Sequence, residues 1–98
     1  MTNIERLTVF RDAIDELDDT ILTMFNRRMV IAAAIAEIKA EENIAVDAPS
    51  REEEVIARAR AAVDEEHADA AEELMQKIMD LSKRRQHEYL ADLKGERP

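Results

Sequence analysis

The sequence lacks cysteine and tryptophan altogether, and it has one glycine and two prolines among 98 residues. Without cysteine there is no disulfide framework. Scarce glycine and proline disfavour sheets joined by tight turns, whereas abundant alanine, glutamate, leucine, isoleucine and arginine are typical of long helices. The composition therefore predicts an all-α chain that forms a single domain over residues 1–98.

Positive charge is also in short supply. The chain has 14 lysines and arginines against 23 aspartates and glutamates, which gives a formal net charge of −9. Non-specific binding to nucleic acid needs an excess of cations facing the phosphates, so we expect no nucleic-acid partner. The sequence after Met1 contains no apolar stretch long enough for a signal peptide or a membrane span, so we expect no membrane partner and a cytoplasmic location.

The segment from about residue 3 to residue 42 contains neither glycine nor proline and predicts one long helix. A seven-residue repeat runs along it, with seam positions Leu7, Phe10, Ile14, Leu17, Ile21, Met24, Arg28, Ile31, Ile35 and Ile38. Such a helix spans about 60 Å, whereas a compact chain of this size has a diameter of about 33 Å. We therefore expect a second copy of the chain to cover the exposed part of the seam.

Two further helices follow a connection at about 43–49. Ser50 and Glu53 have the spacing of a capping box, which predicts a helix from about 50 to 63. Apolar residues at helical spacing predict another from about 69 to 93. His67 and His87 have no paired ligand spacing with acidic residues on a common face, so we expect no metal site. The predicted architecture is three helices, long, short and medium.

Arg28 is the only charged residue on the seam. A cation on an apolar stripe must be paired or face a wet cavity, because burying it alone costs several kcal/mol. Lys39 lies eleven residues later and points the same way on a helix, about 16 Å further along. Two interpretations stay open: the pair binds an anionic ligand, or Arg28 pairs with an acid of another helix and Lys39 extends into water.

Other polar residues allow the same two kinds of interpretation. Ser82 and Gln86 share one face of the third predicted helix with apolar residues. Their side chains either form hydrogen bonds within the core or orient a ligand in a pocket. Arg51 and Glu52 open the second helix, where Arg51 could be a solvated surface residue and Glu52 would favourably face the positive end of the helix. The run 83–85, Lys-Arg-Arg, is interpreted as a solvated face.

The sequence shows no nucleophile with an adjacent base and no glycine-rich phosphate loop. Cations, neutral donors and one carboxylate suit a reaction that needs its substrate held and its developing charge stabilised, without proton transfer. A pericyclic rearrangement of an anion fits that description.

The ordered set Arg11-x-x-Ile14-x-x-x-Asp18, Arg28, Lys39, Arg51-Glu52 and Ser82-x-x-x-Gln86 resembles the AroQ-type, all-helical (type II) chorismate mutases over nearly the whole chain. The resemblance implies an intertwined helical homodimer whose two active sites each take residues from both subunits. It implies the Claisen rearrangement of chorismate to prephenate in phenylalanine and tyrosine biosynthesis. It implies no cofactor, and it leaves a possible partner synthase unidentified.

The same resemblance implies roles for the cations and neutral donors. Arg11 of the partner chain and Arg28 of the home chain would bind the two carboxylates of the substrate, with Ser82 assisting at the ring carboxylate. Lys39 and Gln86 would be catalytic, because they would hydrogen-bond the ether oxygen on which negative charge builds.

At the start of the second helix, the resemblance makes Glu52 the acceptor for the ring hydroxyl and Arg51 a supporting cation at the edge of the pocket. The family commonly has an aspartate three residues before the Arg-Glu pair, where this sequence has Ala48, with Asp47 before it and Pro49 after it. Asp47 is therefore a substrate-binding candidate only if the loop is reshaped.

Two alternatives remain at this level. One is an isochorismate-pyruvate lyase on the same scaffold. Glu52 argues against this alternative, because those lyases lack a glutamate after the loop arginine. The other is a non-catalytic helical dimerisation or regulatory module. This interpretation does not explain why Arg28, Ser82 and Gln86 lie on apolar stripes.

Overall fold

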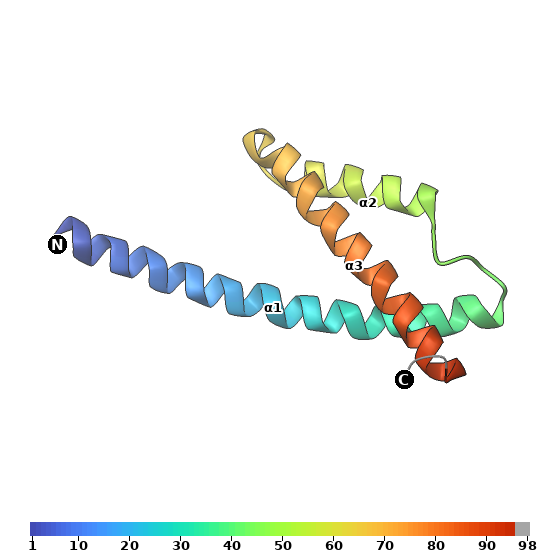
Figure 1. The fold of residues 1–98 in the computed structure, drawn as a ribbon. Helices are drawn as coiled ribbons and strands as arrows, with labels where there is room; N and C mark the ends of the chain where they lie inside the picture. The colour runs from blue at the N-terminus through green and yellow to red at the C-terminus, as the bar shows by residue number, and fades with distance from the viewer. Residues whose placement is uncertain (96–98) are drawn as a thin grey trace. The chain divides into compact units, whose positions relative to one another are not determined.

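The computed structural model describes residues 1–95, which form three α-helices: α1 (Asn3–Glu41), α2 (Pro49–Ala61) and α3 (Ala68–Lys94) (Figure 1). A single 3-10 turn, η1 (Glu65–His67), precedes α3. No strand occurs within residues 1–95, which confirms the all-α prediction with a long, a short and a medium helix. The last three residues of the predicted domain, 96–98, lie outside the described residues. The chain divides into two compact units, Met1–Val30 and Ile31–Pro98.

The first unit is the N-terminal part of α1. Thr2 and Glu5 form a capping box: Thr2 Oγ1 accepts from the Glu5 backbone N–H at 3.1 Å, and the Thr2 backbone N–H donates to Glu5 Oε1 at 3.5 Å. None of residues 1–30 is buried. The apolar seam residues of this unit are between 43% and 61% exposed: Leu7, Phe10, Ile14, Leu17, Ile21 and Met24. A contiguous apolar stripe of this kind is typical of an interaction surface.

The C-terminal end of α1 lies in the second unit and closes with a Schellman motif around Asn43. Asn43 has a left-handed backbone conformation with φ of 57°. Its N–H donates to the Ala40 carbonyl at 3.4 Å, and the N–H of Ile44 donates to the Lys39 carbonyl at 2.7 Å. Asparagine tolerates this conformation better than other residues with a side chain, so the helix ends here without a glycine.

The second helix does not begin with the predicted capping box. Pro49 is the first residue of α2, Ala48 is its N-cap, and no side chain caps it. The capping-box interpretation of Ser50 and Glu53 is therefore wrong. The ring of Pro49 fixes φ at a helical value and lacks the N–H that would need a partner, so proline itself starts the helix.

The helices α2 and α3 pack against each other, with the exposed turn at 62–67 between them. Arg60 connects them through ion pairs to Asp69 Oδ1 at 2.9 Å and Glu72 Oε1 at 3.1 Å. The hydrogen bonds with Asp69 and Glu72 raise the pKa of the Arg60 guanidinium, and the bond with Asp69 has the larger effect.

Small side chains make up most of the buried apolar core of the second unit: Ala32, Ala33, Ala36, Ala68 and Met79. The hydroxyl of Tyr89 on α3 donates to Glu37 Oε2 on α1 at 3.2 Å, and this hydrogen bond raises the pKa of the tyrosine. The guanidinium of Arg85 lies 5.7 Å from the centre of the same ring. In the described part of the chain, no helix combines the length and apolar character that a membrane span requires.

Candidate active site

The eight residues singled out from the sequence fall into both units. Arg11, which is exposed, and Arg28, which is half-buried, belong to Met1–Val30. The second unit contains the other six: Lys39, Asp47, Arg51, Glu52, Ser82 and Gln86.

Lys39 is half-buried in the last turn of α1. Its ammonium donates a hydrogen bond to the backbone carbonyl of Val46 at 2.9 Å. The side chain therefore holds the connection between α1 and α2, a contact that helix periodicity alone does not predict. An ammonium carries three donor protons, so this bond leaves two for a ligand.

Glu52 and Asp47 share one cation, Lys83 of α3. The Lys83 ammonium lies 2.9 Å from Glu52 Oε1 and 3.4 Å from Asp47 Oδ1. These contacts, with the Glu52 hydrogen bond the strongest, raise the pKa of Lys83. The structure thus brings Asp47 next to Glu52 through a shared partner, although the family's usual aspartate position is occupied by Ala48.

The interpretation of residues 83–85 as one solvated face is wrong for Lys83. Its side chain is 28% exposed, and it is bound to two carboxylates. Consecutive residues on a helix point about 100° apart, so three adjacent cations cannot share a face. The sequence therefore already separates the direction of Lys83 from those of Arg84 and Arg85.

Ser82 and Gln86 are both buried on α3. Among the described residues, Gln86 Oε1 is the buried side-chain oxygen or nitrogen that has no hydrogen-bond partner. Buried polar atoms are nearly always satisfied, and leaving one without a partner costs about 1–3 kcal/mol. Gln86 therefore marks a place where a further donor is missing, as expected for a site that a ligand or another chain completes.

Arg51 is not part of this group of contacts. Its side chain is 60% exposed and pairs with Glu54 Oε2 at 3.1 Å, one turn along the same helix. Such an exposed pair contributes little to stability and leaves the guanidinium accessible.

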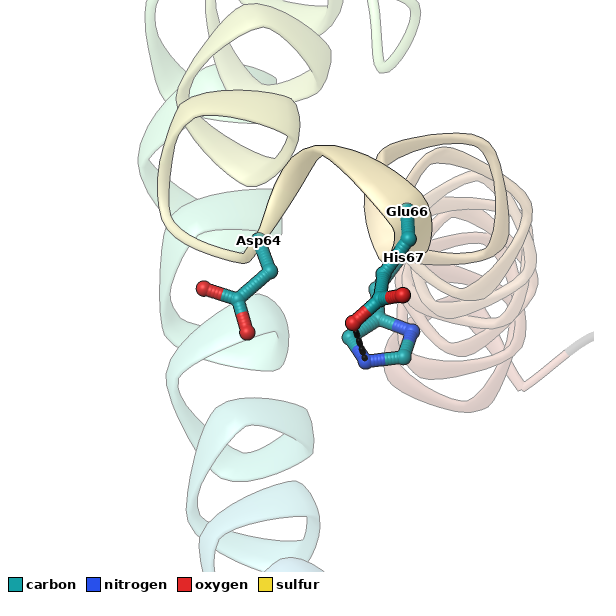
Figure 2. Close-up of side chains that lie close together, drawn as sticks. All are labelled: Asp64, Glu66 and His67. Atoms are coloured by element: carbon teal, nitrogen blue, oxygen red, sulfur yellow. Dashed lines mark ion pairs between the residues drawn. The ribbon is translucent and has the colours of Figure 1, made fainter.

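A separate cluster of possible metal ligands lies at the turn before α3, where Figure 2 shows Asp64, Glu66 and His67. One ligand atom from each lies within 4.8 Å of the others, and His67 Nε2 is 3.6 Å from Glu66 Oε1. Spacing on a helix face does not detect this cluster because it is built by a turn. All three side chains are exposed, where water satisfies them, and the absence of a metal site stays a prediction.

A family model described as chorismate mutase type II matches residues 10–87. This range contains all eight candidate residues. The chain is a member of the type II chorismate mutase family.

Individual relatives agree with this assignment. The chain is 32% identical over 91 residues to a chorismate mutase of Methanocaldococcus jannaschii, covering 91% of this chain and 92% of that protein. It is 38% identical over 52 residues to a bifunctional chorismate mutase/prephenate dehydratase of Aquifex aeolicus, covering 53% of this chain and 14% of that protein. A conserved hypothetical protein of Pyrococcus furiosus has a similar structure, with a TM-score of 0.71, 36% identity and coverage of 83% and 95% of the two chains.

The sequence resemblance to this family is therefore confirmed, whereas the individual role of each residue remains a prediction.

Proposed function

We propose that this chain catalyses the Claisen rearrangement of chorismate to prephenate as an intramolecular isomerase. The observation that carries the proposal is the family match over residues 10–87, which encloses every candidate residue. The carbon–oxygen ether bond of the substrate breaks while a carbon–carbon bond forms, and no proton or electron leaves the molecule. The residues need only bind the dianion in a reactive conformation and stabilise the charge that develops.

Lys39 and Gln86 act on the ether oxygen in this proposal. The ammonium of Lys39 retains two protons beyond its bond to Val46. The side-chain amide of Gln86 donates through Nε2 without having to be protonated, and its buried Oε1 has no hydrogen-bond partner among the described residues. Both donors are aimed at charge that exists mainly in the transition state, which raises turnover more than affinity.

The remaining residues bind the ground state. Arg28 of one chain and Arg11 of its partner take the two carboxylates, and Ser82 assists at the ring carboxylate. Glu52 accepts the hydrogen bond of the ring hydroxyl, and the accessible guanidinium of Arg51 supports the edge of the pocket. The proposal requires no cofactor or metal.

The proposal is tested by following the absorbance of chorismate with the purified chain and identifying the product. We expect chorismate to disappear and prephenate to form. A parallel reaction with isochorismate tests the lyase alternative, in which pyruvate would be released. A protein that converts neither substrate and does not bind a bicyclic dicarboxylate mimic of the transition state would be a non-catalytic module.

We further propose that the functional unit is an intertwined homodimer with shared sites. The support is the N-terminal unit, in which none of residues 1–30 is buried and the apolar seam is exposed. An apolar stripe of this length gains stability only when a second surface covers it. A second copy supplies the matching stripe and brings its Arg11 to the site of the first.

The dimer prediction is checked by light scattering, which should give twice the chain mass of 11.2 kDa. Leu17→Lys places a charge on the seam and should dissociate and unfold the chain together, because the seam is both core and interface. Asp19→Lys introduces the same side chain two residues away, on the opposite side of α1, and should leave the mass unchanged. A folded monomer whose mass is independent of concentration would contradict the shared site.

The reaction belongs, in this proposal, to phenylalanine and tyrosine biosynthesis. The name of the bifunctional relative of Aquifex aeolicus joins chorismate mutase with prephenate dehydratase, an enzyme named for the product of the mutase. Residence in the cytoplasm stays a prediction from the sequence.

A further inference from the structure

Lys83 has no part in the reaction as proposed above, yet it contacts one of the residues that do. Its ammonium is 2.9 Å from Glu52 Oε1 and 3.4 Å from Asp47 Oδ1. It therefore joins α3 to the first turn of α2 and to the connection before it. Lys83 immediately follows Ser82, so its position on α3 is tied to that of the buried polar residues.

The pair of Lys83 and Glu52 differs from the surface ion pairs of this chain. Their side chains are 28% and 24% exposed, whereas those of Arg51 and Glu54 are 60% and 65% exposed. Water screens a partly covered pair less, and fewer side-chain conformations compete with the contact. The Lys83 contact therefore restricts where the Glu52 carboxylate points.

This contact leaves Glu52 able to bind a ligand. An ionised carboxylate accepts hydrogen bonds at both oxygens, with about four lone-pair positions in all. Lys83 bonds to Oε1, which leaves Oε2 and further lone pairs for a hydroxyl donor. Fixing one oxygen of a carboxylate orients the other, and this lowers the entropy cost of binding a hydroxyl.

The connection between α1 and α2 is held at two consecutive residues. Lys39 binds the carbonyl of Val46, and Lys83 binds the carboxylate of Asp47. Two lysines from different helices thus hold the same short segment, and one of them also holds Glu52.

We propose that Lys83 is a positioning residue that orients Glu52 toward the ring hydroxyl of the substrate and fixes Asp47 and the 42–48 connection beside it. The inference rests on the proposed function, because it presumes a hydroxylated ligand at Glu52. Lys83 itself contacts the carboxylates of the protein and acts on the ligand through Glu52.

The test compares two bicyclic dicarboxylate mimics of the transition state, one with the ring hydroxyl and one without it, by isothermal titration of the full chain. The unaltered protein should bind the hydroxylated mimic about tenfold or more tightly than its deoxy counterpart, as one hydrogen bond to a charged group allows. Lys83→Met should bring this ratio close to one while leaving the affinity for the deoxy mimic unchanged. Lys77→Met, which replaces an exposed lysine of the same helix, should retain the ratio.

Glu52→Gln should lower the same ratio, and adding Lys83→Met to it should lower the ratio no further, since both changes act through one carboxylate. Retention of the ratio in Lys83→Met, or an equal loss of affinity for both mimics, would overturn the positioning role. If the unaltered chain converts chorismate, either result leaves the proposed function intact. If it neither converts chorismate nor binds a mimic, the proposed function fails and the role of Lys83 fails with it.

Discussion

Lys39→Ala is expected to lower turnover of chorismate by about 100-fold to 1,000-fold, the usual cost of losing one donor to a developing negative charge. Binding of the substrate should change far less, because the ether oxygen carries little charge before the bond breaks. The measurement is kcat and KM from the absorbance of chorismate, which separates the two effects.

The bond from Lys39 to Val46 gives this experiment a second outcome. If the lysine serves only to hold the connection, its loss should raise KM and lower the free energy of unfolding while turnover stays near that of the unaltered protein. Lys77→Ala is a matched control on an exposed site and should change neither quantity. Turnover unaffected by Lys39→Ala would contradict the catalytic role.

Arg11→Ala and Arg28→Ala should each leave the homodimer nearly inactive, whereas a mixture of the two should recover activity. Losing one partner of a bound charge pair costs about 2–5 kcal/mol, which accounts for the inactivity. The two arginines are seventeen residues apart on α1, so they are separated by about 25 Å along the helix axis and cannot hold one small dianion within a chain. If both bind the substrate, as proposed, they do so from different chains.

In a heterodimer of the two variants, one site has both arginines and the other has neither. Equal amounts of the two chains, unfolded and refolded together, should yield about a quarter of the original activity, because half of the dimers are mixed and each has one intact site of two. Arg27→Ala replaces an exposed neighbour and should remain active without mixing. Mixtures that stay inactive would contradict a shared site and leave the question of chorismate turnover untouched.

The helical architecture follows from the sequence because its determinants are local and repeated. The absence of glycine and proline and the seven-residue repeat both predict α1, and a long uninterrupted pattern averages out local irregularities. The helix ends depend on single residues. Pro49 begins α2 where Ser50 suggested a capping box, and Asn43 ends α1 through a left-handed backbone conformation.

The candidate site divides in the same way between what is local and what is not. Ser82 and Gln86 stand out in the sequence because polar side chains on an apolar stripe are conspicuous, and both are buried. The shared partner of Glu52 and Asp47 could not be found by spacing, since Lys83 lies 31 residues after Glu52 and 36 residues after Asp47. Contacts of this kind depend on how α2 packs against α3, which periodicity does not determine.

The connection at 42–48 must keep its number of residues, which most surface loops need not do. Loops usually accept insertions because few of their atoms are bound elsewhere. Here Asn43 determines where the chain leaves α1. Three and four residues later, Lys39 of α1 binds the carbonyl of Val46 and Lys83 of α3 binds the carboxylate of Asp47. One added residue after Ile44 would move a different carbonyl opposite Lys39 and a different side chain opposite Lys83. Natural variation in loop length should therefore be found in the exposed turn at 62–67, and the 42–48 connection should vary in composition while keeping its number of residues.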